Sequence, residues 1–96
     1  MEKALIHIFN NLQIEKVGSS TEDKFKMLAD YLNHLVSHDF NKLISILYRV
    51  DVSEEKAKRA LANKKEDESN GVVLAKLLIE RESEKIKYRE KYKNKF

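Results

Sequence analysis

The residues between 85 and 96 combine basic and aromatic side chains in a pattern that could bind a partner. The basic residues of this stretch are Lys85, Lys87, Arg89, Lys91, Lys93 and Lys95, against one acid, Glu90. Tyr88, Tyr92 and Phe96 recur every four residues among them. On a helix, side chains four residues apart are neighbours, so the three rings should form one line with basic residues on both sides.

Two kinds of partner suit this surface. Aromatic rings can enter a groove of another protein while lysine stems lie along its rim with their charges in water. The same groups could instead bind RNA or single-stranded DNA, because cations neutralise phosphates and aromatic faces stack on unpaired bases. Aromatic residues at helical spacing more often pack against protein, so we expect self-association as a homodimer through this end of the last helix and through the apolar first helix, with nucleic-acid binding as the alternative.

A second candidate is the row Asp30, His34 and His38, whose steps of four place all three side chains on one helix face. Two imidazoles and a carboxylate could bind a divalent metal. A metal site also needs a further ligand and groups that orient the rings, and the row continues into Lys26 and Glu22. The pattern therefore favours a solvated polar face with no metal or cofactor, and whether these side chains bind a metal stays open.

A third candidate is the segment 46–61, which has the order of elements of a DNA-binding helix-turn-helix. Leu47 stands where that motif usually has a small residue, and Asp51 stands where it usually has glycine. Glu54 and Glu55 would face the phosphates and be repelled by them. An ordinary pair of packed helices is the favoured interpretation.

The chain lacks the patterns of the common catalytic motifs. It has no cysteine, and its two glycines, Gly18 and Gly71, are isolated, whereas phosphate-binding loops and nucleophile elbows need glycine at fixed offsets. We therefore expect a protein that is not an enzyme. Charged residues also interrupt every apolar stretch, so no membrane span is predicted, and we expect a cytoplasmic protein.

Proline is absent and helix-forming residues dominate, so the 96 residues should fold as a single all-α domain, a small bundle of four to five helices with a long C-terminal helix. Apolar spacing predicts a first helix over residues 3–17, and helix starts are predicted near Ser20, Asp39 and Gly71. A short helix should begin after Asp51 or Ser53, since either can cap it.

Two further expectations concern burial and shape. The helix of residues 40–50 is apolar around more than half its circumference and should be the most buried. The last helix would be about 35 Å long if it continues to residue 96, so its basic, aromatic end at 85–96 should project beyond the body of the domain. Residues 85–96 carry a net charge of +5. Because the net charge of the whole chain is +3, residues 1–84 together carry −2.

Two stretches resemble a known group of proteins. HDFNKLISILYRVDVSEEK (residues 38–56) and AKLLIERE (residues 75–82) are similar to a DFxxLIxxLYRxDVSE core and the LIIER-type helix that follows it in a group of small uncharacterised bacterial proteins. The resemblance covers roughly half the chain. It implies a stable small helical domain and transfers no activity, ligand or catalytic residue.

Overall fold

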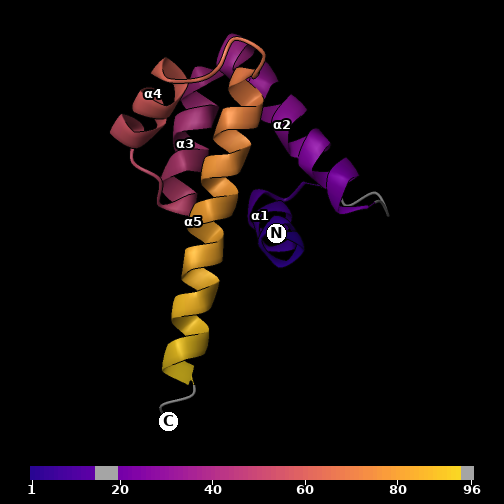
Figure 1. The fold of residues 1–96 in the computed structure, drawn as a ribbon, viewed down its shortest axis with the longest axis vertical. Helices are drawn as coiled ribbons and strands as arrows, with labels where there is room; N and C mark the ends of the chain where they lie inside the picture. Colours follow the sequence, from indigo (N-terminus) through magenta and orange to yellow (C-terminus); the bar gives the residue numbers. More distant parts are fainter. Residues whose placement is uncertain (15–19, 94–96) are drawn as a thin grey trace.

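The computed structural model describes residues 1–14 and 20–93. The helices within them are α1 (Glu2–Leu12), α2 (Thr21–His38), α3 (Phe40–Val50), α4 (Glu54–Ala62) and α5 (Asn70–Lys93). The prediction of an all-α bundle with a long C-terminal helix is confirmed (Figure 1). None of these helices, within the described part of the chain, has both the length and the apolar character needed to cross a bilayer.

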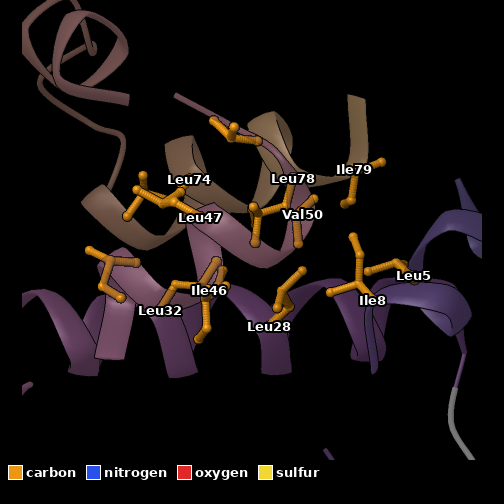
Figure 2. Close-up of a cluster of buried hydrophobic side chains, with 14 of the residues drawn as sticks. Leu5, Ile8, Leu28, Leu32, Ile46, Leu47, Val50, Leu74, Leu78 and Ile79 are labelled. Atoms are coloured by element: carbon orange, nitrogen blue, oxygen red, sulfur yellow. The ribbon is translucent and has the colours of Figure 1, made fainter. Parts of the chain in front are cut away.

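Helix α5 is the central element of the bundle. Its most extensive contact is with α2, and it also packs against α1, α3 and α4 (Figure 1). Figure 2 shows the shared core, where Leu74 and Leu78 of α5 lie among Leu28 of α2, Val50 of α3 and Ile8 of α1. All five of these side chains are fully buried. Burial of such residues is the main force that holds the helices together.

Side-chain caps set the starts of α2 to α5. Ser20, Asp39, Ser53 and Ser69 each accept a hydrogen bond from the backbone amide three residues on, at 3.1–3.2 Å. Each bond satisfies an amide that has no partner within its own helix. The predicted caps Ser20 and Asp39 are confirmed. Of the two alternatives for α4, Ser53 is the cap, while Asp51 ends α3 in the left-handed conformation with φ 67°.

Two predictions about the helices are wrong. Helix α1 ends at Leu12 instead of residue 17, because Gln13 adopts the left-handed conformation (φ 56°) and its amide caps the last turn; residues 15–17 lie outside the described part. Helix α3 is not the most buried, since Phe40 and Tyr48 are 51% and 86% exposed. The first half of α5 is more buried because neighbouring helices surround it.

A close approach between α2 and α5 depends on Gly71. The Gly71 amide donates a hydrogen bond to Asn33 Oδ1 at 3.3 Å. A Cβ atom at this position would clash with the backbone carbonyl oxygen of Ala29 and would lie 2.7 Å from the Asn33 Cβ. Only glycine therefore lets the two helices come this close.

The C-terminal half of α5 projects beyond α3 and α4. The whole of α5 has 24 residues and spans about 36 Å. The turn between α3 and α4 lies beside the middle of α5, and the helix continues past it to Lys93 (Figure 1). The predicted projection of the basic, aromatic end is present as far as residue 93.

Candidate interaction surface on helix α5

One row of side chains runs along α5 from the core to the surface. Its members follow each other at alternating steps of four and three residues, the spacing of a heptad seam, and they are Leu74, Leu78, Arg81, Lys85, Tyr88 and Tyr92. The leucines are fully buried, Arg81 and Lys85 are half-buried, and Tyr88 and Tyr92 are 62% and 44% exposed. The face of α5 that forms the core therefore continues as a surface.

The change from core to surface occurs at Arg81. Its Nη2 atom lies 2.9 Å from Asp51 Oδ2, in the turn where α3 ends. The hydrogen bond with Arg81 and the charge of Arg81 lower the pKa of Asp51, and the same bond together with the charge of Asp51 raises the pKa of Arg81. The α3–α4 pair thus contacts α5 as far as Arg81.

Beyond this point, an open hollow of about 350 Å³ is lined by α5 side chains, namely Arg81, Glu84, Lys85, Tyr88 and Arg89. We call these five residues, together with Tyr92, the α5 ledge. The ledge contains four of the nine residues that the sequence singled out, and it adds Arg81 and Glu84, which the sequence analysis missed.

Helix α1 packs against the other side of α5, with its apolar residues Leu5, Ile8 and Phe9 buried in the core of its own chain, so it does not offer the face that we expected it to contribute to a dimer. Lys3 Nζ is 2.7 Å from Glu90 Oε1, and this ion pair lowers the pKa of Glu90. Ile86 is half-buried against the core. Helix α1 therefore supports the projecting part of α5 from one side and leaves the ledge exposed on the other.

Glu82 organises the basic residues at the foot of the ledge. It is a buried carboxylate, 5% exposed. Arg89 Nη2 lies 3.6 Å from its Oε1, His7 Nδ1 lies 3.5 Å from the same oxygen, and Lys85 Nζ lies 3.9 Å from Oε2. Two of the predicted binding cations are thus held against the protein. Spacing along the sequence offers no signal for the contribution of His7, which comes from a different helix.

The two tyrosines of the ledge form one aromatic patch. Their ring centroids are 4.5 Å apart at an interplanar angle of 44°. A hydrogen bond with Tyr92 raises the pKa of Tyr88, which favours its neutral phenol form. Paired rings present a larger apolar surface than either ring alone.

The remaining predicted residues lie around this patch or beyond the described chain. Lys87, Lys91 and Lys93 are exposed on α5. Lys95 and Phe96 lie outside the described residues. Of the three rings predicted to form one line, the two that the structure describes, Tyr88 and Tyr92, lie next to each other on α5.

A second surface, which the sequence analysis missed, lies on α3 and α4. Phe40, Ile44 and Tyr48 follow each other in steps of four along α3, beside the buried row that contains Leu47. An open hollow of about 490 Å³ runs from this row to the start of α4, lined by Ile44, Leu47, Tyr48, Asp51, Val52, Ser53 and Glu54. We call this hollow the α3–α4 groove. The step-of-four spacing is visible in the sequence, but the apolar character of residues 40–50 predicts burial for this row, whereas Phe40 and Tyr48 are exposed.

The groove and the ledge are parts of one continuous surface. A smaller hollow, about 230 Å³, is lined by Asp51, Val52, Ser53, Lys56, Leu77, Arg81 and Glu84. It shares the turn 51–53 with the groove and shares Arg81 and Glu84 with the ledge. The Arg81–Asp51 ion pair lies at the junction.

Among the described residues, neither the row of Asp30, His34 and His38 nor the segment 46–61 has the arrangement that metal binding or DNA binding would need. The rings of His34 and His38 stack with centroids 4.3 Å apart, and His38 Nδ1 lies 3.1 Å from the His34 carbonyl oxygen. Residues 1–14 and 20–93 contain no cluster of three or more side chains suited to hold a metal ion. Helix α4 begins with Glu54 and Glu55 exposed, so carboxylates occupy the end that a helix-turn-helix would direct at DNA.

Comparison with known proteins gives no relative from which a function could be transferred: no family model, curated protein or solved structure matches the chain. The resemblance to small bacterial helical proteins stays a prediction.

Proposed function

We propose that this protein is a non-enzymatic interaction module that self-associates as a homodimer through the α5 ledge. The observation that carries the proposal is the heptad row of α5, which leaves the core at Arg81 and continues as the exposed patch of Tyr88 and Tyr92. A second helix that packs on this row would extend the seam already used inside the bundle.

The free energy of association favours a two-fold symmetric interface that buries other apolar side chains besides the two tyrosines. Removing apolar surface from water contributes roughly 25 cal/mol per Å², so partial burial of two rings supplies only a few kcal/mol. Association costs about 4–15 kcal/mol. In a two-fold symmetric dimer every contact occurs twice, so binding a second copy of the chain doubles the apolar area that one set of residues buries.

The charges of the ledge distinguish this proposal from nucleic-acid binding. Lys85 and Arg89 both face the Glu82 carboxylate, and Glu84 adds a second acid to the lining of the same hollow. These acids would lie next to a nucleic-acid backbone and weaken its binding. The test can also detect nucleic-acid binding, because the affinity for RNA should fall steeply as the salt concentration rises.

The test is the molar mass of the protein at tens of micromolar, measured by light scattering after size exclusion. We expect a dimer for the wild type and a monomer for the Tyr88→Ala/Tyr92→Ala variant. The matched control is Tyr88→Phe/Tyr92→Phe, which keeps both rings and should stay dimeric. A monomeric wild type would rule out self-association. If that monomer also binds single-stranded RNA in a salt-dependent manner, the nucleic-acid alternative holds instead.

A further inference from the structure

We propose that the α5 ledge of one copy docks against the α3–α4 groove of the second copy, and that the two copies exchange this contact reciprocally about a two-fold axis. The proposal rests on the proposed homodimer and names the surface that receives the ledge.

The groove has the chemistry of a receptor for an aromatic, basic helix. Its floor is formed by the apolar side chains of Ile44, Leu47 and Val52, and the exposed ring of Tyr48 borders it. Asp51, which is also bonded to Arg81, and Glu54, which lies 3.9 Å from Lys58 Nζ, place carboxylates at its rim. An apolar floor with an acidic rim suits tyrosine rings with basic residues on either side.

The ledge carries aromatic and basic side chains that match the apolar floor and acidic rim of the groove, and it lies on the same surface of the molecule. Tyr88 and Tyr92 provide the rings, and Lys85 and Arg89 provide cations beside them. The groove and the ledge are joined through the hollow at the Arg81–Asp51 pair. Two copies that meet across this joined surface can therefore form both ledge–groove contacts in one interface. The area that such an interface buries is closer to the roughly 800 Å² per partner of a stable complex than the area of the ledge alone.

The register of α5 gives this arrangement a specific geometry. An antiparallel pair of α5 helices with its axis between residues 84 and 85 would place Glu84 opposite Lys85 of the second copy. The same register would bring Tyr88 and Tyr92 to the level of Arg81 and Leu77 of the second copy, where the turn 51–53, which lines both the smaller hollow and the groove, flanks α5. All of these residues lie on one face of α5, so one register satisfies opposite charges and aromatic contacts together.

The acidic rim argues against nucleic acid as the occupant of the groove. Phosphates would meet the carboxylates of Asp51 and Glu54, which like-charge repulsion disfavours. A basic, aromatic helix meets the same carboxylates with the favourable sign.

The experiment mixes two variants of the full chain. The ledge variant is Tyr88→Ala/Tyr92→Ala, and the groove variant is Tyr48→Ala/Glu54→Lys. All four side chains are exposed, so both variants should keep the wild-type circular dichroism spectrum. Glu55→Lys is the matched control, because it makes the same charge change one residue beyond the groove lining.

We expect each variant alone to dimerise at least about tenfold more weakly, which corresponds to about 1.4 kcal/mol. A mixture should recover a heterodimer, because the intact ledge of the groove variant meets the intact groove of the ledge variant. The Glu55→Lys control should dimerise like the wild type.

The outcomes separate the two proposals. A groove variant that dimerises like the wild type, beside a monomeric ledge variant, would overturn the docking in the groove and leave the homodimer standing. Two weakened variants that form no heterodimer on mixing would also overturn it. A wild type that is monomeric would overturn both proposals.

Discussion

The guanidinium of Arg81 lies 2.9 Å from the carboxylate of Asp51, and this contact joins the middle of α5 to the turn between α3 and α4. On one side of it α5 is core, and on the other side α5 carries the exposed ledge. The pair therefore marks the place where the ledge begins, at the turn that also lines the α3–α4 groove.

Replacing Asp51 by Asn should lower stability at neutral pH and change its pH dependence. Asparagine tolerates the left-handed backbone of this position, so the ion pair is the main loss. Arg81 lowers the pKa of Asp51 in the folded state, so the unfolded state binds more protons and stability rises with pH. The contribution is complete above the ordinary carboxyl pKa and is lost as pH falls through the folded value.

Urea unfolding of wild type and Asp51→Asn at pH 7 and in acid would measure this effect. The measurement belongs in the Tyr88→Ala/Tyr92→Ala background, so that association does not contribute. We expect the two midpoints to differ at pH 7 and to converge in acid. A difference that stays constant with pH would show that the charge of Asp51 is not the cause.

Replacing Glu82 by Gln should destabilise the fold by about 1–2 kcal/mol. The buried carboxylate faces His7, Lys85 and Arg89, and its loss leaves Lys85 and Arg89 without their counter-charge. Breaking a fully buried pair costs more, about 3–5 kcal/mol, but Arg89 can turn to water because its side chain is largely exposed.

The control for Glu82 is Glu80→Gln, at an exposed carboxylate 3.9 Å from Lys56 Nζ. Chemical denaturation should show a change within about 0.5 kcal/mol for this control. Equal effects at the two positions would contradict an organising role for Glu82.

Replacing Gly71 by Ala should destabilise the fold by about 1–3 kcal/mol, the usual cost of overpacking. The new methyl group would collide with the carbonyl oxygen of Ala29, so α5 would have to move away from α2. Helix propensity alone predicts the opposite sign, a gain of about 1 kcal/mol. Thermal unfolding therefore decides between the two effects. Asn33→Ala, which removes only the hydrogen bond to the Gly71 amide, should cost about 1 kcal/mol.

Replacing Ser53 by Ala should cost about 1 kcal/mol, because the hydroxyl accepts the Lys56 amide at the start of α4. Ser45→Ala, at an exposed position within α3, is the matched control and should change stability by less than about 0.5 kcal/mol. If denaturation midpoints show the same loss at both positions, the cap does not stabilise α4.

Local sequence was sufficient to predict the helices and most of their starts. Ser20 and Asp39 cap where expected because a cap involves only residues within one turn of each other. Composition predicted the helical class, since proline is absent and helix formers dominate. The end of α1 was misplaced because apolar spacing continues past Gln13, whereas the backbone turns into the left-handed conformation there.

Burial depended on the arrangement of the helices in space. The same apolar character marks both sides of α3, and only its packing shows that Leu47 faces the core while Tyr48 is exposed. Spacing placed Tyr88 and Tyr92 on one line of α5, but the contact of Asp51 with Arg81 shows where that line leaves the core. Glu82 and His7 are 75 positions apart in the chain, and they meet because α1 packs along α5. Periodicity within a helix reports which residues share a face, and the neighbouring helices determine whether that face is covered.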